Sequence, residues 1–137
     1  MEEVRTSSIC GGSYDQLPLQ REQQDRHHQH MTPSERITTE VTAWPGVTAG
    51  PGKRGEFAFK VSGREIGHLH GDHAAHFFFP PEVWNELSEQ GRITEHPVFP
   101  GRHGPAARRI TTDEDVTEVI AMMRMNYDRI TARAEVA

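Results

Sequence analysis

The sequence of 137 residues predicts an α+β fold, in which a small, mostly antiparallel sheet is packed by three helices. Two kinds of pattern support this prediction. Apolar residues recur at helical spacing in separate segments, and residues 56–61 alternate between polar and apolar side chains as a strand does. These segments follow one another as helix, strands, helix, strands, helix. That order favours short connections between neighbouring strands, with the helices covering the sheet.

Two regions of different composition divide the chain. Residues 1–31 are expected to form a disordered tail, because Ser, Gly, Gln, His and charged residues dominate there and the apolar residues are too sparse to bury a core. Residues 32–137 are expected to form one folded domain, which is what a chain of this length allows. The run His27-His28-Gln29-His30 could bind metal weakly, but a solvated tail is the better interpretation.

Net charge and cysteine content restrict the classes of partner and environment. With a net charge of -5, nucleic acid is not expected as a partner. No apolar run approaches the roughly 18 residues of a membrane helix, and no hydrophobic segment follows the first residues as in a signal peptide. Cys10 is the only cysteine, so an intrachain disulfide is excluded and a cytoplasmic location is expected.

Order is expected to begin at Thr32, and the first helix is expected to end at Trp44. Thr32 can cap it, Pro33 suits its first position, and Glu35 completes a capping box. Its core-facing residues are expected to be Ile37, Val41 and Trp44.

Residues 56–61 are expected to form a strand that turns back at Ser62-Gly63, a dipeptide suited to a two-residue hairpin. In this register Lys60 opposes Glu65, and the attraction between their charges supports the pairing.

This hairpin determines where the most distinctive segment, Gly67-His68-Leu69-His70-Gly71-Asp72, would point. Side chains two residues apart in a strand share a face, so the two imidazoles are expected side by side. The register pairs Phe59 with Ile66 and Phe57 with His68. The imidazoles would then share a face with the aromatic residues and border the core, as a cluster able to hold a proton, an anion or a metal.

Turn residues and helix signals predict the remaining elements. A proline pair opens the second helix and a glycine closes it. Thr112 is expected to cap the last helix, and the acidic residues after it favour the positive end of the helix dipole. In chain order we expect a strand at His76–Phe79, a helix from Pro80-Pro81 to Gly91, a strand at Arg92–His96, a loop at 97–105, a strand at Ala107–Ile110 and the last helix.

Other chemically active residues have less specific interpretations. His73 and His76 are expected at the surface. Arg108 and Arg109 could hold a substrate anion, but a solvated position is favoured. A further group, expected in the core, consists of Phe77, Phe78, Phe79 and Trp84.

Several stretches together resemble a known family. The most specific is Gly63-Arg64-Glu65-Ile66-Gly67-His68-Leu69-His70-Gly71-Asp72. The others are Ala43-Trp44-Pro45-Gly46-Val47, Phe79-Pro80-Pro81, Glu86-Leu87, Gly91-Arg92, His96, Asp113-Glu114-Asp115-Val116 and Met125-Asn126-Tyr127-Asp128-Arg129. Over residues 35–131 the chain is similar to the luciferase-domain family, and in particular to small bacterial relatives of the fungal luciferase domain.

The resemblance implies an activity as well as a fold. The fungal members look like cofactor-free oxygenases, which add dioxygen to a hydroxylated α-pyrone and emit light. For this chain it implies an oxidoreductase of the monooxygenase kind, which needs no cofactor and takes a hydroxylated aromatic or pyrone-type small molecule. The chain departs from the family pattern in two places: Pro97 follows His96 where a second histidine is usual, and residues 101–107 lack the usual Ser-Gly-Trp stretch.

The resemblance and the residues together nominate a site. A histidine of near-neutral pKa can deprotonate a hydroxylated substrate, and a carboxylate such as Asp72 can fix its tautomer. The expected catalytic residues are His68, His70, Asp72 and His96. The expected substrate-binding residues are Phe57, Phe59, Ile66 and Trp84.

Three alternatives stay open for the same residues. The histidines could hold a divalent metal if a third ligand comes from a neighbouring segment. They could instead satisfy backbone groups at a strand end, with Asp72 stabilising the turn. The domain could also be a non-enzymatic module that binds a small molecule or a protein.

Overall fold

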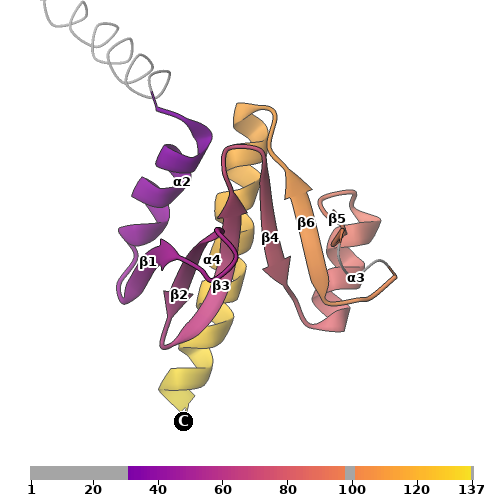
Figure 1. The fold of residues 1–137 in the computed structure, drawn as a ribbon. Coiled ribbons are helices and arrows are strands. Elements are labelled where there is room, and N and C mark those ends of the chain that lie inside the picture. The colour runs from indigo at the N-terminus through magenta and orange to yellow at the C-terminus, as the bar shows by residue number, and fades with distance from the viewer. Residues whose placement is uncertain (1–30, 98–100, 137) are drawn as a thin grey trace, which may run out of the picture. The chain divides into compact units, whose positions relative to one another are not determined.

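The computed structural model describes residues 31–97 and 101–136, and the predicted α+β class is confirmed (Figure 1). Within this part of the chain, an antiparallel sheet of six strands in the order β1-β2-β3-β4-β6-β5 is packed by three helices. Nearly all of the expected tail lies outside the described residues. The helices are α2 (Pro33–Thr42), α3 (Pro81–Glu89) and α4 (Asp113–Val136). The strands are β1 (Val47–Pro51), β2 (Phe57–Val61), β3 (Arg64–His70), β4 (Ala74–Phe78), β5 (Thr94–Glu95) and β6 (Pro105–Arg109).

Helix α2 begins at Pro33, as the sequence predicts, and ends two residues before Trp44. Its first turn is stabilised by a residue far away in the sequence, because the Ser34 backbone N–H donates to Asp72 Oδ1 at 2.9 Å. A carboxylate at this end also suits the helix dipole. The contact ties the turn between β3 and β4 to α2.

The hairpin between β2 and β3 turns at Ser62-Gly63, as predicted. Both turn residues have positive φ, 53° and 75°, which is the conformation of a two-residue type I′ turn. Lys60 pairs with Glu65 here, so the predicted register is confirmed next to the turn.

Further from the turn the predicted register is wrong. A β-bulge shifts it by one residue, so Phe59 pairs with Gly67 instead of Ile66, and Phe57 pairs with Leu69 instead of His68. Ile66 is the extra residue of the bulge. A shift of one residue moves every later side chain of β3 to the opposite face.

The shift places the β3 histidines on the face of the sheet that points away from α4. Gly67 marks the α4 face, since a Cβ built there would lie 3.1 Å from Met123 of that helix. Leu69, two residues on, shares this face. His68 pairs with Ala58 on the other face, and His70 lies beside it.

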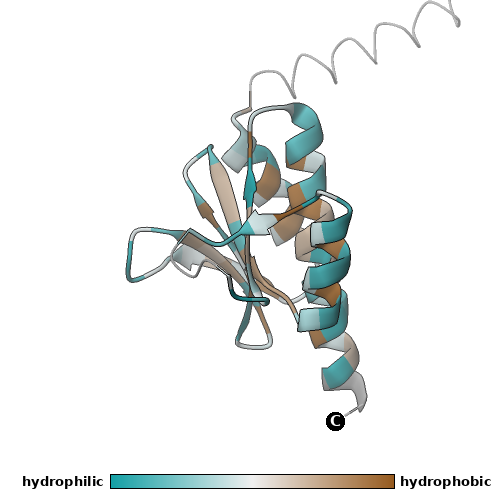
Figure 2. Ribbon diagram, turned by 90° about the vertical axis from the view of Figure 1, so that its right-hand side faces the viewer, coloured by the Kyte–Doolittle hydropathy of each residue, from teal (hydrophilic) through white to brown (hydrophobic). Residues whose placement is uncertain are grey.

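The core lies between the sheet and the helices. Figure 2 shows the helices on one side of the sheet, with apolar segments on their inner surfaces. None of the described helices combines the length and apolar character needed to cross a membrane. The fully buried large side chains come from α2, β2, β3, α3, α4 and the end of β4, and they are Ile37, Val41, Phe59, Ile66, Leu69, Phe79, Leu87, Val116, Val119, Met122, Met123 and Asn126.

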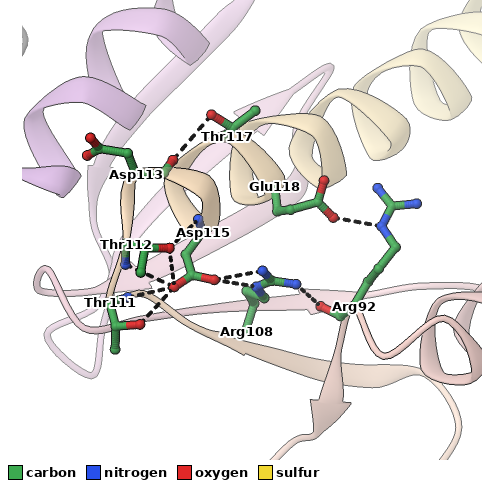
Figure 3. Close-up of polar contacts among 8 residues, drawn as sticks. All are labelled: Arg92, Arg108, Thr111, Thr112, Asp113, Asp115, Thr117 and Glu118. Carbon is green, nitrogen blue, oxygen red and sulfur yellow. Dashed lines mark hydrogen bonds and ion pairs between the residues drawn. The ribbon is translucent and has the colours of Figure 1, made fainter.

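The start of α4 is anchored by Asp115 (Figure 3). The Asp115 backbone N–H donates to Thr112 Oγ1 at 3.2 Å, which confirms the predicted cap. The carboxylate accepts hydrogen bonds from the backbone N–H groups of Thr111 and Thr112 and from Arg108, and these keep its pKa well below the ordinary value. The expectation that Arg108 is solvated is therefore wrong, because this ion pair joins β6 to α4.

Gly67→Val is expected to destabilise the domain by about 1–3 kcal/mol, because the added side chain overpacks the interface with α4. A Cβ there already lies 3.0 Å from the Phe77 ring. Gly50→Val is the matched control, since a Cβ at this position of β1 meets nothing within 4 Å. Urea unfolding measures both variants, and equal stability losses would contradict this placement of α4.

Candidate functional site

Four histidines from separate segments gather on the face of the sheet away from α4. His68 and His70 come from β3, and His76 of β4 stands directly opposite His68 in the antiparallel register. His96 follows β5, which reaches the site through β6, because Ala107 pairs with both His76 and Thr94.

The four imidazole rings form a contiguous cluster. The ring centroids of His68 and His70 are 5.0 Å apart, and those of His68 and His76 are 5.2 Å apart. His76 lies at the centre, 4.4 Å from His70 and 4.2 Å from His96. His68, His76 and His96 each offer a ring nitrogen, and these three nitrogens all lie within 4.8 Å of one another.

His76 is the buried member of this cluster. It is 9% exposed, and its Nδ1 has no hydrogen-bond partner among the described residues. Burial lowers its pKa to about 4, and the neighbouring His96, His70 and His68 add to the shift. The pKa of His96 is lowered as well, first by burial and then by His68 and His70. His76 is therefore neutral near pH 7, and its ring can accept a proton or a metal ion through an unprotonated nitrogen.

A carboxylate orients His68. Its Nδ1 lies 2.8 Å from Glu65 Oε2, and a proton on Nδ1 would be donated to that oxygen. This arrangement leaves Nε2 as the acceptor or metal-binding atom of the ring. Glu56 adds a second acidic group nearby. Its pKa is lowered mainly by hydrogen bonds from the backbone N–H groups of Glu56 and Arg54, and to a smaller extent by His68 and His70.

The cluster has the composition of an open three-histidine metal centre. Neutral imidazole is a good ligand for Zn, Cu, Fe and Ni, and three protein ligands leave coordination positions for water or substrate. The same rings could move protons without a metal. Among the described residues, His68, His76 and His96 form the group that could hold a metal ion.

The predicted catalytic residues are partly brought together. His68, His70 and His96 share the cluster, whereas Asp72 lies in the turn after β3 and accepts the α2 hydrogen bond. The catalytic role of Asp72 stays a prediction. His76 is a correction, since a surface position was expected and the structure buries it. The alternation of β4 could have indicated which face His76 occupies, because Ala75 and Phe77 point to the core and His76 lies between them.

The predicted substrate-binding residues lie elsewhere. Phe57 and Phe59 pair with Leu69 and Gly67 on the α4 face, whereas the bulge directs His68 and His70 to the opposite face; Ile66 is fully buried. Trp84 of α3 donates its indole N–H to the Pro105 carbonyl at 3.0 Å and stacks on His103, with ring centroids 4.6 Å apart. None of these four predicted residues is therefore the cross-strand partner of a clustered histidine.

A hollow lined by charged residues lies next to the partners of His68. Its volume is about 580 Å³, and its wall includes Ala58 and Glu65, the pairing partner and the hydrogen-bond partner of His68. Lys53, Arg54 and Lys60 line it as well. A small molecule in this hollow would meet basic side chains beside the imidazoles.

Comparison with known proteins gives a family for this part of the chain. Residues 63–126 match the family model of the luciferase domain, which confirms the predicted resemblance over this range. The matched segment contains all four clustered histidines. Neither the curated proteins nor the solved structures gave a match.

Acidification is expected to destabilise the protein between about pH 6.5 and about pH 4. The pKa of His76 falls from 6.5 to about 4 on folding, so the unfolded chain binds more protons in this window and stability falls with pH. The shift corresponds to about 3 kcal/mol. In urea unfolding with a chelator present, the free energy of unfolding of His76→Gln should depend less on pH than that of the unmodified protein. His73→Gln, a change at an exposed histidine, should leave the dependence unchanged. A pH dependence that His76→Gln leaves unchanged would contradict the buried neutral imidazole.

Proposed function

Because residues 63–126 match the family model of the luciferase domain, we propose that the protein is a small oxygenase-type enzyme acting at the four-histidine cluster. Its substrate is a hydroxylated aromatic or pyrone-type small molecule, and dioxygen is the co-substrate. The observation that carries the proposal is the convergence of three imidazole nitrogens within 4.8 Å on one face of the sheet.

In this proposal His68, His76 and His96 bind one divalent transition metal ion. Three features support a metal ion over a purely structural cluster. The Nδ1 of His76 is buried, and no residue in the described part of the chain hydrogen-bonds to it. His76 is neutral near pH 7, as a ligand imidazole must be. Glu65 contacts the Nδ1 of His68, as carboxylates behind metal-binding histidines do.

The metal ion would act as a Lewis acid that lowers the pKa of a substrate hydroxyl. His70 has a separate role, because it lies outside the three-nitrogen group and is exposed. Its ring centroid is 4.4 Å from that of His76, so it can accept the proton that the hydroxyl releases. The neighbouring hollow provides the space for the substrate.

Acid–base chemistry without metal is the competing mechanism. A general base works best when its pKa lies near the working pH. His76, with a pKa of about 4, is a poor base at neutral pH, although its nitrogen is a good ligand. Asp72, the predicted partner of a catalytic base, is engaged with α2. These two observations favour the metal-bearing site.

Metal binding can be tested with a full-length background in which His27, His28 and His30 are replaced by alanine, since these residues could compete for metal. This protein is expected to bind about one equivalent of Co²⁺ or Zn²⁺, measured by metal analysis and isothermal titration. His96→Ala should abolish tight binding, and Glu65→Gln should weaken it by about 10–100-fold.

His73→Ala is the matched control for these variants, because this histidine is exposed in the turn before β4. It should bind metal as tightly as the background protein. Equal metal affinity in His96→Ala and His73→Ala would contradict the proposed ligand set.

Oxygen uptake tests the activity itself. The metal-loaded protein is expected to consume dioxygen with at least one member of a panel of hydroxypyrones and catechols. His70→Ala should lower the rate by about 10²–10⁴-fold, the usual contribution of a general base, whereas His73→Ala should not.

The pattern of results separates the alternatives. Uptake that resists a chelator would support the metal-free mechanism. Tight metal binding without uptake on any substrate would indicate a non-enzymatic binding module.

A further inference from the structure

A second pocket, which we call the arginine pocket, opens at the end of the sheet where β3 begins and β4 ends. It has a volume of about 500 Å³ and lies against the C-terminal turns of α4. Figure 1 shows α4 running past this end of the sheet. Its lining residues include Arg64 of β3, Phe78 of β4, Pro80, and Arg129, Ile130 and Arg133 of α4.

Three guanidinium groups converge on this pocket. Arg129 and Arg133 are four residues apart on one helix, where like charges repel. Burial lowers the pKa of Arg129, and the nearby charges of Arg133 and Arg64 lower it further. Such crowding costs stability unless an anion lies between the charges.

Few acidic side chains in the described part of the chain neutralise these three arginines. Arg129 donates to the neutral Asn126 Oδ1. Among the described side chains, neither Arg64 nor Arg133 forms an ion pair. Glu65 is the acidic group in the pocket wall, and its carboxylate is already engaged by His68. In a chain with a net charge of -5, three arginines without carboxylate partners indicate an anion site.

An exposed aromatic ring forms the other side of the pocket. Phe78 was expected in the core, but it is 66% exposed, whereas Phe77 and Phe79 on either side of it are buried. Gly104 packs against one side of the Phe78 ring, since a Cβ at Gly104 would lie 3.2 Å from the ring. A supported, exposed ring offers a stacking surface to a flat ligand.

The arginine pocket and the histidine cluster share neighbouring residues of β3 and β4. Phe78 lies two residues beyond His76, and therefore on the same strand face, about 7 Å along β4. Glu65 lines the pocket and also contacts His68. A ligand roughly 10 Å long, at about 3.3 Å per residue of strand, could reach from the arginines to the histidines.

We propose that the arginine pocket binds the acid group of an aromatic carboxylate whose ring packs on Phe78, and that such carboxylates are the substrate class of the histidine site. The substrate assignment rests on the proposed function. The binding claim stands on the pocket alone. Arginine favours carboxylates because its planar fork can donate two parallel hydrogen bonds to them.

Binding is tested by NMR titration of the full-length, metal-free protein at low ionic strength. The probes are 4-hydroxycinnamate, its uncharged methyl ester and inorganic phosphate. The carboxylate is expected to bind at least about tenfold more tightly than the ester, since an ion-paired group contributes most of that difference. Arg64→Gln, Arg133→Gln and Phe78→Ala should each weaken its binding about three- to tenfold.

Arg109→Gln is the matched control, because this exposed arginine lies on β6 outside the pocket, and it should leave the affinity unchanged. The proposal is overturned if the ester binds as tightly as the carboxylate, or if Arg109→Gln weakens binding as much as Arg64→Gln. Phosphate binding as tight as that of the carboxylate would overturn the role of Phe78.

A further variant separates this proposal from the proposed function. His96→Ala, which removes a proposed metal ligand that does not line the arginine pocket, should bind 4-hydroxycinnamate within about twofold of the unmodified protein in the absence of metal. If the carboxylates bind but are never turned over, the arginine pocket stands and the assignment of substrate class fails. If only uncharged phenols are turned over, the assignment fails as well.

Discussion

The one-residue β-bulge at Ile66 is the constraint on which the site depends. Without it, the alternation of β3 would direct His68 and His70 toward α4, into a layer that has no room for charged or hydrated groups. With it, Gly67 and Leu69 take that face, and the glycine lets Met123 approach closely. Bulges often redirect side chains at functional sites, and this one assigns β3 a packing face and a chemical face.

The chemical face combines groups that would repel one another if all were protonated. The four ring centroids lie within about 5 Å of their neighbours, and burial keeps the central ring, His76, neutral near pH 7. A metal ion would replace this repulsion with attraction. Glu65 contacts His68 of the cluster and also lines the arginine pocket. This residue therefore lies between a site that favours a cation and a site that favours an anion.

Elements with local signals could be predicted from the sequence. The turn at Ser62-Gly63 and the cap at Thr112 depend on neighbouring residues alone, and both are confirmed. The face of the histidines could not be predicted, because the register with and without the bulge pairs Lys60 with Glu65 equally well. His76 and the arginine pocket depend on contacts between distant segments. His96, by contrast, is predictable through the family resemblance, since its place in the sequence matches the family pattern.

The most direct test of a metal-bearing histidine centre is the X-ray absorption spectrum of the Zn²⁺- or Co²⁺-loaded protein in the background without the tail histidines. The account predicts about three imidazole nitrogens at about 2.0–2.1 Å, with oxygen filling the remaining coordination. A first shell of oxygen alone, or one with a single imidazole, would contradict it.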